Sequence, residues 1–145
     1  QGPFNAHAPA TMGYQLPFRP QQIYKNGIRL VNAWSQATHQ KPFHQLSQQE
    51  KDDALTQMQK NGIDFATLGE NDLKASHFFN QLLTDTKHGY LSDPIYGGNR
   101  DMVSWKMLGF PGARYDYRDY VSKHNQTLDL VPLSIQGSAA WKMKG

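Results

Sequence analysis

The stretch from Asp72 to Gly89, DLKASHFFNQLLTDTKHG, gives the clearest indication of the fold. Apolar side chains recur in it at the spacing of an amphipathic helix, at Ala75, Phe78, Phe79, Leu82 and Leu83. We expect this helix to end at Gly89, because glycine commonly follows the last turn. Burying one Leu or Phe side chain contributes roughly 1.5 to 3 kcal/mol, so this face should form a large part of the core.

Two more helices are predicted earlier in the chain. Pro20 suits the first position of a helix, and apolar residues at helical spacing follow it, which predicts a helix over residues 20–39. Ser47 and Glu50 have the spacing of a capping box, which predicts a helix over residues 48–61. The first of these helices should share the core with the helix after Asp72.

The two ends of the chain lack helical periodicity. Residues 1–20 contain four prolines, and residues 1–19 are expected to form an extended arm that lies on a surface through Phe4, Tyr14, Leu16 and Phe18, with a mobile terminus as the alternative. The last 20 residues carry only short apolar runs and are expected to wrap as an extended tail. The sequence therefore predicts a mainly α protein, with a small irregular domain of about four helices over residues 20–145.

Composition excludes several function classes. The 145 residues carry a net charge of +3, but the basic residues are scattered among acidic ones, which does not favour nucleic-acid binding. No apolar run approaches the roughly 20 residues that cross a bilayer. The absence of cysteine excludes disulfides, iron–sulfur ligation and CxxCH haem attachment in this chain. Because the chain opens on Gln1 without methionine, we expect a signal peptide to have been removed, with a truncated chain as the alternative.

A search for catalytic chemistry predicts no catalytic, cofactor or metal site. The Gly97-Gly98 pair is not a GxGxxG fingerprint, and no serine has a GxSxG context. The six histidines include no pair at the spacing that zinc sites use. Two alternatives stay open: a small enzyme that uses His77 or His88 with Asp93, and a stand-alone carbohydrate-binding module that stacks sugars on Trp34, Trp105 and Trp141.

The segment after the strongest helix, SDPIYGGNRDMVSWKMLGFPG at residues 92–112, is built to hold one shape. Its glycines allow tight turns and its prolines fix φ. Asp101 is expected to be the N-cap of a short helix that runs through Trp105 to Leu108. Tyrosine and arginine are enriched from residue 90 to 120, a composition typical of protein interfaces.

This segment also carries a family resemblance. Phe78-Phe79, Leu82-Leu83, Thr86, Gly89 and Tyr90, followed by SDPIYGGNRD, Trp105-Lys106 and the GFPG of residues 109–112, resemble the small subunit of the gluconate 2-dehydrogenase family. That subunit is called subunit 3 or the gamma subunit. The resemblance covers roughly residues 20–136, and neither the arm before it nor the tail after it carries a family signal that we can name.

The resemblance implies a non-catalytic subunit of a heterotrimeric complex. In such complexes a large flavoprotein holds FAD, with an iron–sulfur cluster as a further option, and oxidises a sugar or sugar acid. A multihaem cytochrome c subunit with haem c takes the electrons and anchors the complex to the inner membrane. The small subunit carries a twin-arginine export signal and escorts the flavoprotein into the periplasm, so this chain would meet the membrane only through the complex.

The candidate residues for the partner interface follow from the motif and from the tyrosine-rich run behind it. Each of them could instead belong to an internal scaffold, because tight glycine turns serve folding as readily as binding. Trp105 and Phe110 are expected to be buried, either inside this chain or against the flavoprotein. The candidates are Tyr96, Gly97, Gly98, Asn99, Arg100, Trp105, Phe110, Tyr115 and Tyr117.

Overall fold

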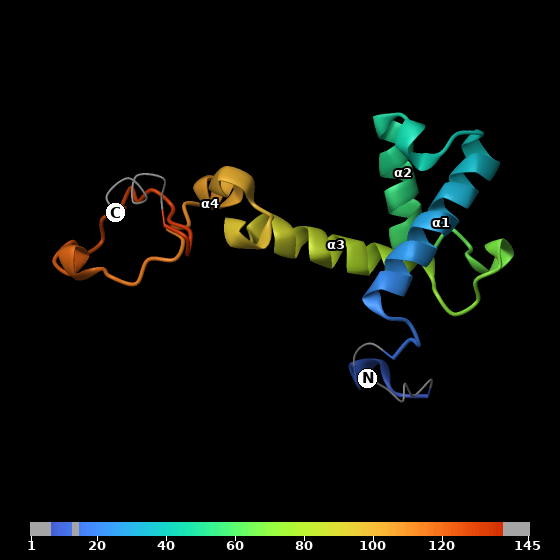
Figure 1. Cartoon of the computed structure of the whole chain (residues 1–145), viewed down its shortest axis with the longest axis horizontal. Helices are drawn as coiled ribbons and strands as arrows, with labels where there is room; N and C mark the ends of the chain where they lie inside the picture. Colours follow the sequence, from blue (N-terminus) through green and yellow to red (C-terminus); the bar gives the residue numbers. More distant parts are fainter. Residues whose placement is uncertain (1–6, 13–14, 138–145) are drawn as a thin grey trace. The chain divides into compact units, whose positions relative to one another are not determined.

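A computed structural model describes residues 7–12 and 15–137 and confirms the mainly α fold (Figure 1). This part of the chain contains four α-helices and no β-strand: α1 (Pro20–His39), α2 (Gln48–Gln59), α3 (Ala75–Leu91) and α4 (Val103–Leu108). Single turns of 3-10 helix lie between and around them, at Ala10–Met12, Phe43–Gln45, Ala66–Leu68, Pro94–Tyr96, Arg100–Met102 and Arg118–Tyr120. The predicted helix over residues 20–39 is confirmed at both ends.

The chain divides into two compact units, residues 1–83 and residues 84–145. The boundary falls within α3, so this helix contributes residues to both units. The single domain expected over residues 20–145 stays a prediction.

The hydrophobic core of the first unit draws on three helices and on the connection between α2 and α3. Its buried members are Ile23, Leu30 and Val31 from α1, Met58 from α2, Ile63, Phe65 and Leu73 from the connection, and Ala75 and Phe78 from α3. The expected contribution of α1 and α3 is confirmed. The three side chains from the connection belong to no helix, so helical periodicity does not predict them.

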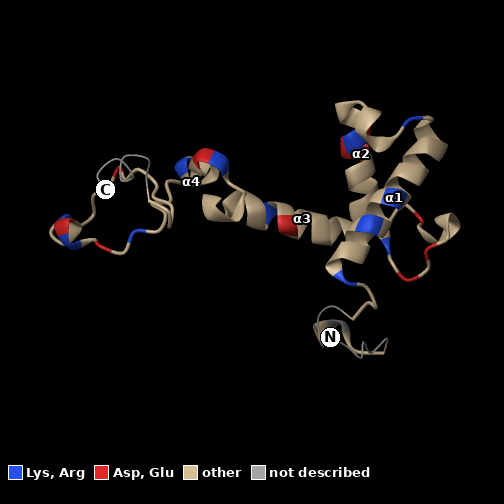
Figure 2. Cartoon of the chain, in the orientation of Figure 1, with Lys and Arg blue, Asp and Glu red and all other residues tan. Residues whose placement is uncertain are grey.

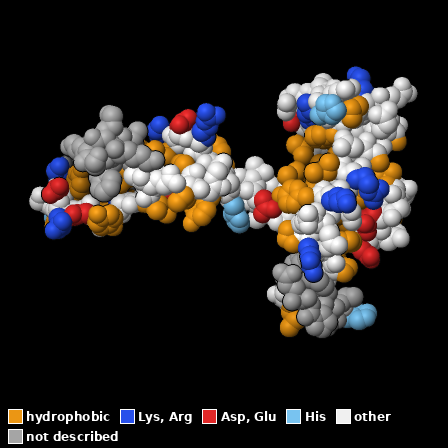
Figure 3. Space-filling model, viewed as in Figure 1, with side chains coloured by type: hydrophobic (Ala, Val, Ile, Leu, Met, Phe, Trp, Pro, Cys, Tyr) orange, Lys and Arg blue, Asp and Glu red, His pale blue; other side chains and the backbone are white. Residues whose placement is uncertain are grey.

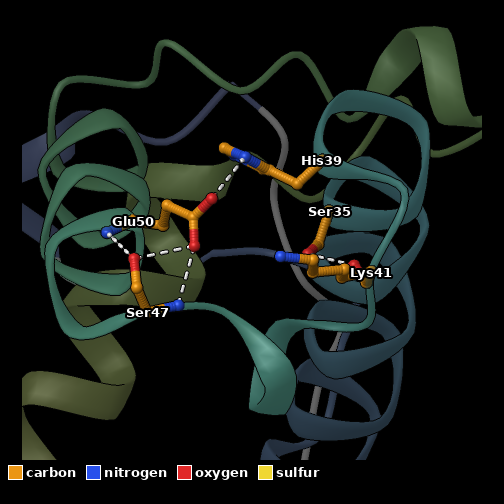
Figure 4. A network of polar contacts seen from close by, with 5 residues as sticks. All are labelled: Ser35, His39, Lys41, Ser47 and Glu50. Carbon is orange, nitrogen blue, oxygen red and sulfur yellow. Dashed lines mark hydrogen bonds and ion pairs between the residues drawn. The ribbon is translucent and has the colours of Figure 1, made fainter.

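A small polar network holds the connection between α1 and α2 (Figure 4). The Ser35 hydroxyl donates to the carbonyl of Lys41 at 2.7 Å. The Glu50 carboxylate accepts hydrogen bonds from the backbone N–H and the hydroxyl of Ser47, both at 2.7 Å. Its other oxygen lies 3.5 Å from Nδ1 of His39. The predicted capping box is confirmed, and its bonds, the backbone one foremost, hold the pKa of Glu50 below its ordinary value.

The predicted end of α3 is wrong. The helix passes through Gly89 and ends at Leu91. Glycine stops a helix where the chain must turn left-handed, but at Gly89 the chain stays helical and the carbonyls of the last turn find partners. The Ser92 hydroxyl, for example, donates to the carbonyl of Gly89 at 3.0 Å.

The short helix predicted up to Leu108 is confirmed as α4, but the predicted N-cap, Asp101, is wrong. Both Asp101 and Met102 adopt a left-handed φ, 57° and 56°, so the chain turns there before the helix begins. The Asp101 carboxylate lies 3.9 Å from the guanidinium of Arg100 and makes no capping bond.

The ends of the described chain agree with the expected arm and tail. Leu16 and Phe18 of the arm pack against the core of the first unit, whereas Phe4 and Tyr14 lie outside the described residues. In the second unit the tail contains no α-helix from residue 121 to residue 137. It joins the rest of the unit through an isolated parallel β-bridge between Gly112 and Leu133.

Candidate partner interface

Asn99 sets the shape of the loop that links α3 to α4. Its side chain is buried, with 6% of the residue surface exposed, and its backbone adopts a left-handed φ of 44°. The amide nitrogen donates to the carbonyl of Ser92 at 2.9 Å, and the amide oxygen accepts from the backbone N–H of Ser104 at 3.0 Å. Asn99 therefore satisfies a free N–H in the first turn of α4, which is the role that the sequence predicted for Asp101.

Gly98 allows the same loop to lie directly against the end of α3. A Cβ at this position would overlap the carbonyl oxygen of Gly89 and lie 2.7 Å from its carbonyl carbon. Both of these atoms are backbone, so a side chain could be accommodated only if the loop or the helix moved. Gly98 therefore has a folding role, which favours the internal scaffold over the interface at this position.

Trp105 anchors α4 to the last turn of α3. Its indole N–H donates to the carbonyl of Leu91 at 2.9 Å, and the neighbouring Ser104 hydroxyl donates to the carbonyl of Tyr90 at 2.6 Å. Only 6% of Trp105 is exposed, and its ring meets that of Phe110 edge to face with the centroids 5.2 Å apart. Trp105 is thus buried inside this chain. This was one of the two predictions for it, the other being burial against the flavoprotein.

Asp93 ties the same loop to the C-terminal tail. Its Oδ1 accepts from the Ser134 hydroxyl at 2.7 Å and from the backbone N–H of Ile95 at 3.0 Å, and its Oδ2 accepts from the backbone N–H of Ile135 at 2.8 Å. Burial by itself would raise the pKa of this carboxyl. The three hydrogen bonds outweigh burial and hold the pKa of Asp93 below its ordinary value.

The other interface candidates divide by exposure. Tyr96 and Tyr115 are 77% and 95% exposed, and the side chain of Arg100 is almost fully exposed as well. Phe110 is 47% exposed, so the expectation that it is buried inside this chain is wrong, and burial against a partner stays a prediction. Tyr117 is partly exposed and meets Tyr120 edge to face.

An apolar groove of about 470 Å³ lies beside α4 and was not predicted from the sequence. Hydrophobic side chains gather on the visible face in this region (Figure 3). Periodicity could not find the groove, because its members come from the end of α3, from α4 and from the turn after it. They are Leu91, Trp105, Leu108, Gly109, Phe110 and Pro111.

Charged groups around these apolar residues are of both signs (Figure 2). Arg118 donates from Nε and from the terminal nitrogen to the two oxygens of Asp116, at 3.0 and 2.5 Å. The guanidinium foremost holds the pKa of Asp116 below its ordinary value. Asp116 and Arg118 therefore form an exposed ion pair within this unit.

Of the groups proposed for independent catalysis, Asp93 has a structural role. The oxygens of Asp93 are bonded to Ile95, Ser134 and Ile135. Burial, and then the charge of Lys74, lower the pKa of His77. Within residues 7–12 and 15–137, no group of three or more His, Cys, Asp or Glu side chains could hold a metal ion.

The tryptophans proposed as sugar-stacking platforms are not all available. Trp105 is buried, so it offers no open face, and that part of the carbohydrate-binding hypothesis is wrong. Trp34 packs against the core of the first unit and meets His39 edge to face. Trp141 lies outside the described residues.

Comparison with known families assigns the chain. A family model described as gluconate 2-dehydrogenase subunit 3 matches residues 8–112. Because the match covers well over half of the sequence, the chain belongs to the gluconate 2-dehydrogenase subunit 3 family. The name of the family implies a subunit of a multi-subunit gluconate dehydrogenase complex. Neither a curated protein nor a solved structure matches the chain.

The limits of this match revise the resemblance drawn from the sequence. The match begins at residue 8, so the expectation that the arm carries no family signal is wrong. It ends at residue 112, so the family resemblance from there to residue 136 stays a prediction.

Among the described residues, none of the helices combines the length and the apolar character that a membrane span requires.

Proposed function

We propose that the chain is a non-catalytic small subunit that binds the FAD-containing large subunit of a gluconate 2-dehydrogenase-like complex. One observation carries this proposal: the large hydrophobic side chains that the described structure leaves exposed are concentrated between residues 90 and 135, with only Met12 and Ile28 elsewhere. Contiguous apolar surface on a soluble chain is typical of a binding site for another protein.

The fold supports a binding role over a catalytic one. The loop that presents Tyr96 and Arg100 is held by the buried Asn99 and by the anchor at Trp105. A loop with a fixed shape loses little conformational freedom on binding, so more of the contact energy appears as affinity. Exposed tyrosine and arginine on such a loop are the residue types that contribute most to binding.

The finer parts of the proposal rest on family membership. We infer that the large subunit oxidises gluconate or a related sugar or sugar acid, and that a multihaem cytochrome c subunit receives the electrons. We further infer that this chain escorts the flavoprotein into the periplasm on a twin-arginine signal and stabilises it there. The complex would then meet the inner membrane through the cytochrome subunit.

Co-expression tests the escort role. The flavoprotein subunit is produced with and without this chain, and its amount, its bound FAD and its dehydrogenase activity are measured in the periplasm. We expect all three to fall when the chain is absent. A flavoprotein that is exported and fully active without this chain would refute the escort role.

Binding is tested separately with Tyr96→Ala and Arg100→Ala. Both side chains are exposed, so these variants should fold normally and should weaken the complex with the flavoprotein. Trp105→Ala is not suitable, because its ring and its N–H hold α4 in place. A dissociation constant unchanged in both variants would remove this loop from the interface.

A further inference from the structure

Residues 128–137, here called the C-terminal strap, lie outside the family match. They are nevertheless hydrogen-bonded to Asp93 and to residues 111–114. The backbone N–H of Leu133 donates to the carbonyl of Pro111 at 3.2 Å, and the carbonyl of Leu133 accepts from the N–H of Ala113 at 2.7 Å. These bonds make the parallel bridge at Gly112, where a Cβ would overlap the carbonyl oxygen of Leu133. The strap therefore lies as close to the GFPG turn as backbone atoms allow.

Side chains fasten the strap at two further points. The Asp93 carboxylate holds the hydroxyl of Ser134 and the N–H of Ile135, and Ser134 and Asp93 are both buried. The guanidinium of Arg114 donates to the carbonyl of Val131 at 2.8 Å. The strap thus has a defined position along its length from Val131 to Ile135.

The same bonds leave two β-branched aliphatic side chains facing outwards. Val131 is 68% exposed and Ile135 is 63% exposed, while Pro132 and Ser134 between them are buried. Exposing two such side chains on a segment fixed by polar bonds has no folding benefit. The strap also borders the groove directly, since Pro111 both lines the groove and accepts the hydrogen bond from Leu133.

We propose that the C-terminal strap is a second binding element for the flavoprotein subunit, with Val131 and Ile135 docking on an apolar surface of that partner beside the groove. This inference rests on the proposed function, because it takes the same partner. The chemistry of the strap supports an apolar partner surface, since Asp129 is its single charged residue. Its attachment to Asp93 orders it before binding, which removes an entropic penalty from the association.

The test uses the full chain and the flavoprotein subunit, recognised by its FAD spectrum, with dissociation constants measured for four single variants. Val131→Asp and Ile135→Asp change the strap, Phe110→Ala changes the groove, and Ile28→Asp is the control. Ile28 is also an exposed β-branched aliphatic residue, and it lies outside the strap, the groove and the exposed apolar set of residues 90–135. We expect each strap variant to weaken binding about 10- to 100-fold, the range set by burying a charge in place of one aliphatic contact, and Ile28→Asp to have little effect.

Each other outcome overturns a stated part of the reasoning. If Phe110→Ala weakens the complex and the strap variants do not, the strap is excluded from the interface while the proposed function stands. If Ile28→Asp weakens binding as much as the strap variants, added charge alone explains the loss and the assignment to the strap fails. If the isolated chain is a dimer that the strap variants dissociate, with flavoprotein binding unchanged, the strap binds a second copy of this chain. If the wild-type chain binds no flavoprotein, the proposed function itself fails.

Discussion

The close packing of α1 against α3 in the first unit gives a quantitative test of the fold through Gly27→Ala. Gly27 is buried in the middle of α1 and faces Phe78, of which only 4% is exposed. A Cβ on Gly27 would overlap Cδ2 and Cγ of the Phe78 ring and lie 2.6 Å from its Cε2. The ring is rigid and enclosed by the core, with Tyr24 packed edge to face against it, so it cannot move away freely.

Two opposing terms set the expected magnitude. Adding a methyl group to a well-packed core costs about 1 to 3 kcal/mol. Alanine is about 1 kcal/mol more favourable than glycine inside a helix. Because three ring carbons would lie in contact with the new Cβ, we take the upper end of the packing cost, which leaves a net loss of about 2 kcal/mol in the free energy of unfolding.

Gly89→Ala is the matched control, since Gly89 is also inside a helix but a Cβ there would meet nothing within 4 Å. With no packing cost, this variant should gain about 0.5 to 1 kcal/mol. Urea unfolding followed by circular dichroism measures both changes. If Gly27→Ala is as stable as the wild type, or if both variants change stability alike, the overlap with Phe78 does not determine the packing of α1.

A double-mutant cycle makes the same point independently. In Phe78→Leu the smaller side chain vacates part of the space that the new Cβ needs, so Gly27→Ala should cost less in that background. We expect a favourable coupling energy of about 1 kcal/mol, within the range found for residues in contact. Strictly additive effects would show that the two positions do not compete for space.

Two further predictions concern polar groups. Ser47→Ala removes the cap of α2 and should lower the free energy of unfolding by about 1 kcal/mol, whereas Ser47→Asp should retain most of the stability that the cap provides. Equal losses in the two variants would show that the hydrogen bond from the N–H of Glu50 to the residue-47 side chain contributes nothing. Asp93 gives a pH dependence: its folded pKa lies below the unfolded value of about 4, so its carboxylate contributes stability that is fully present above that value and is lost as the pH falls through the folded pKa. Asp93→Asn should lower stability at neutral pH and flatten its decline in acid, and an acid slope equal to that of the wild type would contradict this account.

The candidate interface was only partly predictable from the sequence. Residue type and the motif pointed to Tyr96, Arg100 and Phe110, and the structure exposes all three. The same reasoning could not separate them from Asn99 and Trp105, which are buried and hold the loop. The exposure of each side chain depends on how α4 is held against the end of α3. The hydrogen bonds that hold it are accepted by backbone carbonyls, which every residue type has, so residue types do not predict them.

The sequence by itself determined the helical class, both ends of α1 and the start of α2, whereas the predicted end of α2 at Asn61 lies two residues beyond the observed end at Gln59. Pro20 at the first helical position and the Ser47–Glu50 capping box act through bonds within a few residues, so the local sequence contains all that is needed to predict them. The Phe78 side chain was likewise assigned to the core correctly from its spacing.

Tertiary structure decided the end of α3, the start of α4 and the position of the strap. The last carbonyls of α3 are satisfied by Ser104 and Trp105, 14 residues further on, so the helix can continue past Gly89. Asp93 binds Ser134 across 41 residues of sequence. Such bonds form only when the chain has already folded, which is why no local pattern could predict which residues hold the loop and which are left for a partner.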